Sequence, residues 1–552
     1  MKASVLKRKI ETGIDRETAQ KTDISCDMHM DRRAFFKTVA LASSAALVDW
    51  TGMGALADSV KNKGDFPVVV IGSGLGGLVC AAYLSRFGFD VTMLEQHSIP
   101  GGYATAFERG DFTFDVSLHA TVAEHAMPQM ILEDLGLWKH LDVAYTPELR
   151  RIITDRFDIT LPAKDPEGVK ARLSVQFPHE KTGIHGFYTQ MEQVISELWG
   201  GGASHSSIMG KLEHLTLSQW MDQHVSDPDV KTCMAVFSGY YGLPPEELNA
   251  LFYAIATGEY LVHGGQYYKA RSQDLSDTLA KGIQLFNGRI HYNTRAKQIL
   301  FTPDKTITGV KDRHGTVYPA RAVIANCPVP ALVNSLVPPS VMPASFAAQA
   351  QQRRPSLSSF VVWLGLNRPV PGITDYEIDL AGTAGTAETS GNGLFNKADL
   401  AESGIGVTIY DNLFQGYSAQ GKTTMNLICL SDYARWQEFE TDYFNNEKQA
   451  YNREKERIAA RFIQRVENAL IPGLSDMIEE MEIGTPLTNV FYTGNTGGAI
   501  YGYDRNRPHL ESQTPVNGLY LASAWSHGGG YTPVMMGGRQ TAQQVIKDFK
   551  GD

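Results

Sequence analysis

The chain has 552 residues, which is enough for two or three domains and a large buried core. Hydrophobic residues make up 43% and charged residues 20% of the sequence, an ordinary globular composition. The formal net charge of −10 argues against a nucleic-acid partner.

The N-terminal region has the pattern of an export signal. Arg32 and Arg33 precede an apolar stretch, residues 38–48, which is too short to span a bilayer. An A-x-A cleavage pattern ends at Ala57. We therefore expect residues 1–57 to be a leader with a twin-arginine signal peptide, read by the twin-arginine export machinery, and a periplasmic or exported protein that does not span the membrane. The alternative interpretation is a short basic amphipathic helix.

A strand, a glycine turn and a helix follow in order. Residues 68–71 are a continuous apolar run, which predicts a strand buried on both faces. The glycines after it give G-x-G-x-x-G, in which the first permits the turn, the second lets the backbone approach a pyrophosphate and the third lets the helix pack closely. Residues 75–86 are predicted to be helical, with N-terminal N–H groups facing the pyrophosphate. The expected cofactor-binding residues of this turn are Gly72, Ser73, Gly74, Leu75, Gly76 and Gly77.

An acidic residue completes the dinucleotide-binding pattern. A second predicted strand, residues 90–94, ends at Glu95, where a carboxylate suits the hydroxyl pair of a ribose. An acid there disfavours a 2′-phosphate, so FAD or NAD is expected rather than NADP. A glycine-rich turn of an unrelated α/β protein remains the alternative, but it does not require strand, helix, strand and acid in this order.

The next residues favour FAD. A second glycine pair, Gly101 and Gly102, lies in PGGYATAF, and FTFDVSLHA follows at residues 112–120. These stretches resemble the start of flavoproteins of the phytoene desaturase, carotenoid isomerase and retinol saturase group. The resemblance implies FAD as the cofactor and places the glycine pair at it. The group often carries a basic residue just after the pair, where this chain has Tyr103.

The middle of the chain predicts a substrate domain interrupted by a return to the cofactor. Residues 126–268 have mostly helical spacing, and the aromatic and aliphatic residues at 237–241 and 251–255 are either core or an apolar substrate channel. Short strands are predicted between residues 289 and 325. The resemblance implies that this segment rejoins the FAD domain, with the backbone of Ala296 at the adenine.

The closing stretch predicts a second helix N-terminus aimed at the cofactor. A strand at residues 518–522 leads through a glycine loop to a helix at residues 532–549. The resemblance implies that this loop holds the ribityl chain and the flavin ring, and we expect residues 526–530 to lie against the flavin. The cofactor-binding residues expected here are Trp525, Gly529 and Gly530. Related proteins often have an acid near Ala524, which this chain lacks.

Three residues are candidates for proton transfer because each adjoins a segment expected to border the flavin ring. They are His119, Tyr501 and His527. Flavin accepts or donates a hydride at N5, so a protein acid or base is optional. Each histidine has the alternative role of a hydrogen-bonded structural residue.

These observations predict an α/β two-domain flavoprotein with a Rossmann-type FAD-binding domain of the glutathione-reductase and amine-oxidase kind and an interleaved α+β substrate domain. We assign residues 64–125, 264–335 and 484–552 to the FAD-binding domain and residues 126–263 and 336–483 to the substrate domain. No C-x-x-C pair or ligand-like histidine spacing occurs, so no metal site is predicted.

The expected activity is that of an FAD-dependent oxidoreductase acting on C–C or C=C bonds of an apolar polyene or isoprenoid-like substrate, by desaturation, saturation or isomerisation. The chain has one dinucleotide fingerprint, so a quinone or redox carrier is the expected electron partner rather than NAD(P)H. Two alternatives share the fold: a flavin amine oxidase, and a prenyl-protein escort factor that does not use flavin.

Overall fold

The computed structural model describes residue 53 and residues 57–58, 63–117, 119–200, 207–383, 399–505 and 510–549. The predicted twin-arginine pair lies outside these residues, as does most of the predicted cleavage pattern. Met53 and Ala57 are described, and their side chains are buried in the core of the domain that follows. Among the described helices, none combines the length and the apolar character needed to cross a membrane.

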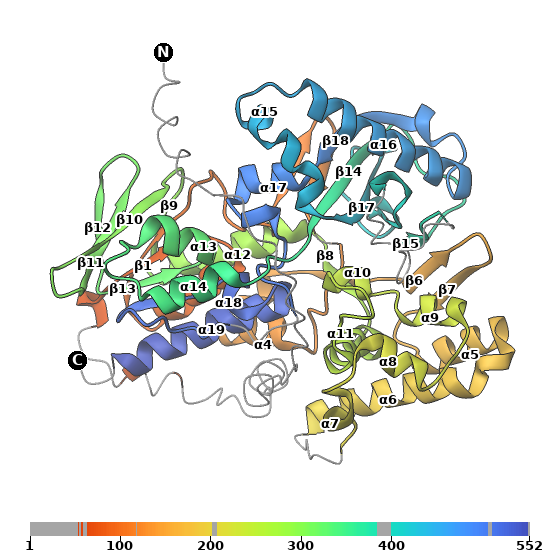
Figure 1. Ribbon diagram of the computed structural model, residues 1–552, viewed down its shortest axis with the longest axis horizontal. Coiled ribbons are helices and arrows are strands. Elements are labelled where there is room, and N and C mark those ends of the chain that lie inside the picture. The colour runs from red at the N-terminus through yellow and green to blue at the C-terminus, as the bar shows by residue number, and fades with distance from the viewer. Residues whose placement is uncertain are drawn as a thin grey trace, which may run out of the picture.

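A five-stranded parallel sheet forms the centre of the N-terminal domain (Figure 1), in the order β19-β13-β1-β2-β9. The strands are β1 (Pro67–Ile71), β2 (Asp90–Leu94), β9 (Arg289–His291), β13 (Ala322–Ala325) and β19 (Leu519–Leu521). Three segments far apart in the sequence thus build one sheet, which confirms the predicted Rossmann-type domain and its return.

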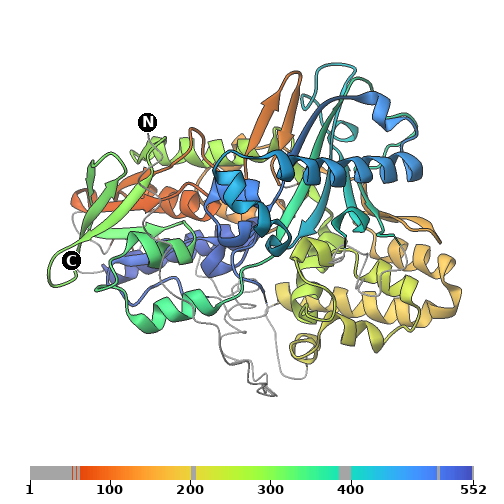
Figure 2. The same cartoon turned by 45° about the horizontal axis from the view of Figure 1, so that its top comes forward.

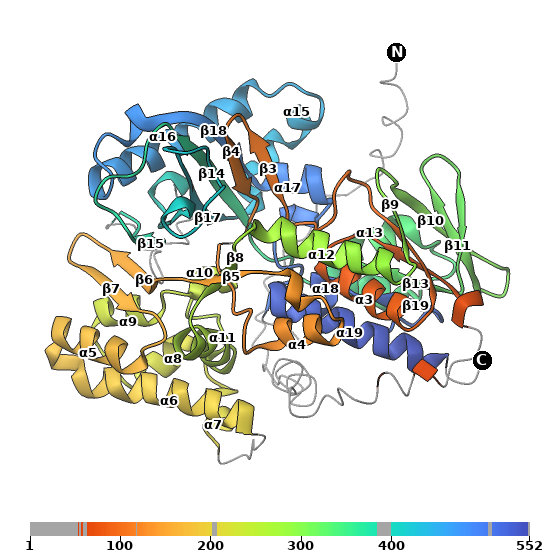
Figure 3. The same ribbon diagram turned by 180° about the vertical axis from the view of Figure 1, so that it is seen from behind.

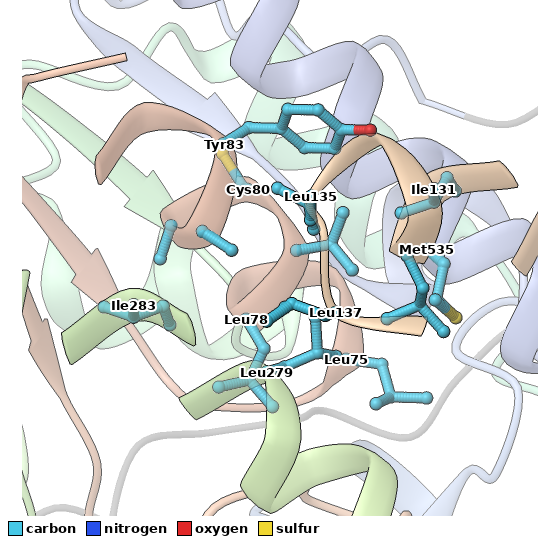
Figure 4. Packing of buried hydrophobic residues seen from close by; sticks show 14 of the residues in the cluster. Leu75, Leu78, Cys80, Tyr83, Ile131, Leu135, Leu137, Leu279, Ile283 and Met535 are labelled. Carbon is cyan, nitrogen blue, oxygen red and sulfur yellow. The ribbon is translucent and has the colours of Figure 1, made fainter. Parts of the chain in front are cut away.

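Helices cover one face of this sheet. They are α3 (Leu75–Arg86), α4 (Met127–Asp134), α12 (Arg271–Leu285) and α19 (Tyr531–Asp548). Val68 and Val70 of β1 point into this layer. Residues 75–85 of α3 are all buried, as expected for a helix that is apolar on every side. Leu78 of α3 and Leu279 of α12 point toward each other in Figure 4, and Figure 3 shows the layer from outside.

The alternate residues of β1, Val69 and Ile71, face the opposite side. There they pack against a three-stranded sheet of β10 (Ala296–Phe301), β11 (Ile307–Asp312) and β12 (Val317–Pro319), and against α14 (Ala344–Gln352). Both faces of β1 are therefore covered, as the continuous apolar run predicts.

A seven-stranded sheet forms the second domain, in the order β18-β14-β17-β16-β15-β6-β7. Its strands are β6 (Glu148–Ile153), β7 (Asp158–Pro162), β14 (Ser358–Leu366), β15 (Glu377–Leu380), β16 (Ile405–Ile409), β17 (Thr423–Ser431) and β18 (Ile478–Gly484). Neighbouring strands are antiparallel except β15 and β6, which are parallel. Helix α16 (Gln449–Ala469) packs on one face through Phe462 and its neighbours. Figure 2 shows α16, in blue, along this sheet.

A helical layer completes the second domain. Its longest members are α6 (Lys181–Gly200) and α11 (Ala250–His263), with α5 (Pro166–Gln176), α7 (Ile208–Leu212), α8 (Leu217–Asp222), α9 (Pro228–Met234) and α10 (Ser238–Tyr241) beside them. These helices share one apolar core, which includes most of the aromatic residues between 237 and 255. Those side chains are therefore mostly core, the first of the two interpretations left open by the sequence.

The transitions between the domains fall later than the sequence-based boundaries. Residues 127–141 were assigned to the substrate domain, but α4 packs on α3 and α19 through Ile131 and Leu132. Helix α14 was likewise assigned there, but Phe346 and Ala350 pack in the core beneath the five-stranded sheet. Both segments belong to the FAD-binding domain by their contacts.

Candidate active site

The glycine turn after β1 is shaped by close backbone packing. Gly72 has a φ of +93°, a conformation that favours glycine. A Cβ on Gly76 would lie 2.1 Å from the carbonyl oxygen of Ala522, and one on Gly77 would lie 2.6 Å from that of Gly72. The turn and the first residues of α3 can therefore be held close to β19 only without side chains.

Asn326, at the end of β13, organises this turn, a role that the sequence did not indicate. Its Nδ2 donates to the carbonyl oxygens of Gly72 and Gly74, each at 3.2 Å. A Cβ on Gly74 would lie 2.8 Å from the same nitrogen. Asn326 thus fixes the carbonyl groups of the turn, so that the N–H groups at the start of α3 are left for a phosphate.

Glu95 is held at the end of β2 with its carboxylate buried. The backbone N–H and the hydroxyl of Ser73 donate to Oε2 at 2.8 and 2.5 Å, and the N–H of His97 donates to Oε1 at 2.8 Å. A carboxylate has about four acceptor positions. The three donors fix its orientation and leave capacity for a ribose hydroxyl.

A cavity of about 1130 Å³ begins at this turn and extends into the seven-stranded sheet domain. Twelve of the predicted cofactor-binding residues and two of the candidate catalytic residues line it. The cofactor-binding residues are Gly72, Ser73, Gly74, Leu75, Gly76, Glu95, Gly101, Gly102, Ala296, Trp525, Gly529 and Gly530, and the catalytic candidates are His119 and Tyr501. Gly77 and His527 are not among the described residues that line it. For Gly77 this agrees with the packing role expected of the third glycine.

The second glycine loop also reaches the cavity. Gly530, with a φ of +105°, precedes α19, whose first residue Tyr531 lines the cavity. Gly529 lies directly against Tyr501, because a Cβ there would be 2.5 Å from the Tyr501 Cα. The indole N–H of Trp525 donates to Asn495 Oδ1 at 2.9 Å, which fixes the ring beside the loop.

His527 has a structural environment. Ser526 Oγ lies 2.8 Å from its Nδ1 and Ser512 Oγ lies 2.8 Å from its Nε2. Burial lowers its pKa to about 4. We expected residues 526–530 to lie against the flavin. Of these, Gly529 and Gly530 line the cavity, and residues 526–528 are not among the described residues that line it.

Tyr501 lines the cavity with its hydroxyl engaged. The hydroxyl donates to the backbone carbonyl oxygen of Tyr240 at 2.5 Å, and Arg505 lies over the ring at 5.0 Å from its centroid. Burial raises the pKa of Tyr501, an effect that the guanidinium of Arg505 opposes. The ring contacts both Gly242 and Gly529, so it connects the helical layer to the glycine loop.

His119 belongs to a buried group of charged and polar side chains, which we call the Arg150 cluster. Its members are His119, Arg150, Tyr240, Glu377 and Asp379. His119 Nε2 lies 3.3 Å from Glu377 Oε1. Burial is the main cause that lowers the pKa of His119 to about 4, so the ring is neutral at pH 7.

Arg150 is the centre of this cluster. Its Nη1 lies 3.3 Å from Glu377 Oε2 and its Nε lies 3.3 Å from Asp379 Oδ2. Its guanidinium lies over the rings of both Phe237 and Tyr240, 4.9 and 4.7 Å from their centroids. Burial acts to lower the pKa of Arg150, but the two carboxylates and Tyr240 outweigh it and raise that pKa. The guanidinium is therefore a fixed cation.

The Arg150 cluster was not predicted from the sequence. Two buried strands contain charged residues in the sequence. In β15 these are Glu377 and Asp379, two positions apart, and in β6 one of them is Arg150. Charges at alternate positions share one face of a strand. That signal identifies no partner, because β6 and β15 are more than 200 residues apart in the chain.

The residues present fit FAD. The start of α3 and the start of α19 both border the cavity, so two helix N-termini are available to anionic or electron-rich groups. Without side chains, Gly74 and Gly76 pack directly against Asn326 and Ala522, which holds the turn at the edge of the cavity, and Glu95 provides the ribose acceptor. Tyr103, where related proteins often have a basic residue, lines the cavity and offers no charge; burial raises the pKa of its hydroxyl to about 12.

Comparison with known proteins identifies relatives over most of the chain. The model of the family described as flavin containing amine oxidoreductase matches residues 75–546. The chain is 23% identical to all-trans-retinol 13,14-reductase of Danio rerio, over 83% of this chain and 82% of that protein. It is 24% identical to the chloroplastic prolycopene isomerase of Daucus carota, over 88% and 80%. Phytoene desaturases are also among its relatives, so the resemblance stated from the sequence is confirmed.

Solved structures support the same fold. An oxidoreductase from Methanosarcina mazei matches with a TM-score of 0.62 at 15% identity, covering 86% of this chain and 99% of the other. The prediction of an α/β two-domain fold of the amine-oxidase kind is confirmed.

Proposed function

Because this chain belongs to the family of flavin containing amine oxidoreductases, we propose that it transfers hydride between FAD and a C–C or C=C bond of an apolar polyene or isoprenoid-like substrate. Its relatives include, by name, a retinol reductase and a prolycopene isomerase. Saturation, desaturation and redox-neutral isomerisation are all compatible with this proposal.

The observation that most directly supports this proposal is that the cavity is continuous from one domain to the other. From the glycine turn it extends past Gly529 and Tyr501 to apolar side chains of the second domain, among them Val236, Trp363 and Ile428. Pockets for a single ligand are typically about 300–1,000 Å³, and this cavity of about 1130 Å³ exceeds that range. The volume and the lining support a cofactor and an apolar substrate bound in one space.

The residues that line the cavity would hold the cofactor and the substrate and exclude water from them. FAD, when bound, supplies hydride chemistry at N5. Tyr501 lies beside Gly529 of the glycine loop, and its hydroxyl donates a hydrogen bond to the carbonyl oxygen of Tyr240. His119, whose pKa burial lowers to about 4, also lines the cavity and is neutral at pH 7.

Both alternatives are less well supported. The relatives include, by name, a retinol reductase, a prolycopene isomerase and a phytoene desaturase, which favours a polyene over an amine as the substrate. An escort factor without flavin would not need the glycine turn with Asn326 and Glu95 in place.

Export and the electron partner extend this proposal. A twin-arginine signal exports folded proteins, which suits a protein that takes up FAD in the cytoplasm. In the periplasm the electron partner would be a quinone or a redox carrier. The support is the sequence around Arg32 and Arg33 and the presence of one dinucleotide fingerprint.

Anaerobic flavin spectroscopy tests the activity. The FAD-loaded protein, oxidised or pre-reduced, is mixed with retinoids, carotenoids, unsaturated lipids and amines. We expect a polyene to bleach the oxidised flavin, to reoxidise the reduced flavin, or to isomerise with the reduced form. An amine that bleaches the flavin while every polyene is inert would contradict the proposal.

Export is tested by fractionation of cells expressing the precursor. The Arg32→Lys, Arg33→Lys double variant is expected to remain in the cytoplasm, and wild type is expected in the periplasm. Equal periplasmic amounts of both would contradict the twin-arginine interpretation.

A further inference from the structure

Asp115, at the end of a short strand, has a fully buried carboxyl group one layer behind the cavity wall. Its backbone carbonyl oxygen accepts a hydrogen bond from the indole N–H of Trp363 at 2.7 Å. Ser272 Oγ donates to Asp115 Oδ1 and lies 3.3 Å from the carbonyl oxygen of Thr105. Thr105, Trp363 and the next residue in the chain, Val116, all line the cavity. A charge on Asp115 therefore acts on the contents of the cavity across a single layer of residues.

Tyrosines surround this carboxyl group. Tyr417 donates to Asp115 Oδ2 at 3.1 Å. Burial, and after it the charge of Asp115, raises the pKa of four tyrosines well above 10, namely Tyr267, Tyr410, Tyr417 and Tyr531. Tyr531 is the first residue of α19 and also lines the cavity, so it connects Asp115 to the cavity wall.

Two of these tyrosines have hydrogen-bonding capacity that the structure leaves open. The hydroxyls of Tyr267 and Tyr531 are buried and have no hydrogen-bond partner among the described residues. A phenolic hydroxyl can donate to a carboxylate or accept from a protonated carboxyl group. The surroundings of Asp115 thus suit both of its protonation states, whereas a carboxylate with a purely structural role would be expected to use all the donors buried beside it.

Asp115 has no cationic partner among the residues that the structure describes. The donors to its carboxylate are the hydroxyls of Ser272 and Tyr417. Burial raises the pKa of Asp115 to about 6, although these hydroxyls and that of Tyr267 act to lower it. The charge of such a group responds to any further charge that is placed near it.

Charged side chains on the neighbouring elements face the tyrosines. The guanidinium of Arg271 in α12 lies over the ring of Tyr417, 4.7 Å from its centroid. After burial and Asp115, Glu377 of β15 also raises the pKa of Tyr410. The tyrosines stay protonated between about pH 5 and pH 8, because their pKa values lie well above 10. Asp115 is therefore the member of this group whose charge changes in that range.

We propose that Asp115 takes up a proton when the flavin bound in this cavity is reduced and releases it when the flavin is reoxidised. Desaturation removes a hydride and a proton from two neighbouring carbons of the substrate. The hydride carries two electrons to the cofactor, which becomes more negative by one charge, and the proton passes to solvent. Asp115 takes up one proton from solvent and no electron, because the added negative charge favours its neutral form. Saturation reverses each of these transfers.

This inference rests on the proposed function because it requires FAD in the cavity. It adds Asp115 as a positioning residue, which acts on the cofactor by its charge from behind Tyr531 and Trp363.

The reduction potential of the bound FAD, measured against a reference dye without substrate, tests this inference. Asp115→Asn keeps the size of the side chain but cannot become charged. At pH 8 we expect the equilibrium constant for reduction to be about tenfold larger in this variant than in wild type, a rise of about 30 mV for a two-electron couple. At pH 5 the carboxyl group of wild type is also neutral, so the two potentials should coincide.

Asp411→Asn is the matched control. The carboxylate of Asp411 accepts from Ser418 Oγ at 2.7 Å and from the N–H of Thr424 at 2.6 Å, and burial raises its pKa. None of these three is among the described residues that line the cavity. The variant removes the same charge as Asp115→Asn, and we expect its potential to follow that of wild type at every pH.

Tyr417→Phe tests the carboxyl group without removing it. Asp115 loses a donor that lowers its pKa, so we expect the bend in the plot of potential against pH to move to higher pH. A reduced-minus-oxidised infrared spectrum of wild type at about pH 6.5 should show a new C=O band of a protonated carboxyl group. These two measurements decide the question if Asp115→Asn does not fold or bind FAD.

Two failures can be told apart. If the potential of Asp115→Asn differs from that of wild type equally at pH 5 and pH 8, or at neither, Asp115 has a structural role and this inference is overturned. A plot for Tyr417→Phe that matches wild type, with no new infrared band, overturns it as well. The proposed function survives both results, because no substrate enters the measurements. If wild type binds no FAD at all, both are overturned.

Discussion

Single residues decide whether the glycine turn can receive a pyrophosphate, and Asn326 is the clearest case. Its side chain joins the turn after β1 to the end of β13 by two hydrogen bonds to backbone oxygens. The turn glycines were predictable from their spacing. The role of Asn326 was not, because its partners are more than 250 residues away.

Asn326→Ala is expected to weaken FAD binding. Two lost hydrogen bonds of about 0.5–1.5 kcal/mol each correspond to a decrease in FAD affinity of about fivefold to 150-fold. Titration of the apoprotein with FAD measures this change in affinity. Asn412→Ala is the control, because Asn412 Nδ2 also donates to two backbone carbonyl oxygens, of Ile373 and Asp375, away from the cavity. Equal FAD affinity in Asn326→Ala and wild type would contradict the role.

The buried His527 gives a pH dependence of stability. Its pKa is about 4 in the folded protein and about 6.5 when unfolded. Between pH 4 and pH 6.5 the unfolded state binds more protons at this residue than the folded state does. The free energy of unfolding therefore decreases as the pH falls from 6.5 to 4, and this contribution is absent above pH 6.5.

His527→Gln should remove this dependence. We expect wild type to lose up to about 3 kcal/mol more than His527→Gln between pH 7.5 and pH 4.5, measured by urea unfolding. Parallel pH profiles of the two proteins would contradict the buried, neutral state of the ring.

At the scale of elements, the glycine loop and Tyr501 form the contact between the two domains at the cavity. Gly529→Ala places a methyl group within 2.5 Å of the Tyr501 Cα. Overpacking of this kind costs about 1–3 kcal/mol of stability, and we expect the loop to shift and FAD content to fall. Thermal unfolding and the visible spectrum report the two effects.

Gly64→Ala is the control for that variant. Gly64 has no atom within 4 Å of an added Cβ and no positive φ, so the substitution should be neutral. If Gly529→Ala is as stable and as fully loaded with FAD as Gly64→Ala, the loop does not pack as described.

The helices and strands next to the glycine motifs could be predicted from the sequence, whereas the elements against which they pack could not. The predicted strand at 68–71 and the helix at 75–86 match β1 and α3 because their apolar pattern is local. Helix α4 was also predicted, but not its domain, because an amphipathic helix does not reveal which core its apolar face joins. The Arg150 cluster depends on the pairing of β15 with β6, which is equally non-local.

At the scale of the whole molecule, the chain passes through each domain more than once, and the cavity lies where the segments meet. One domain contributes the glycine turn, Glu95 and the glycine loop to the cavity. The other domain contributes Trp363, Ile428 and Asp379. The account therefore requires that cofactor and substrate occupy this one cavity together.

A crystal structure of the FAD-loaded protein with a bound polyene tests this requirement most directly. The account expects FAD to lie along Gly74 and Glu95 with its ring at Gly529, and the polyene to lie between that ring and Arg150. A flavin bound at Gly74 with the polyene outside the cavity, or a cavity closed to FAD, would contradict it.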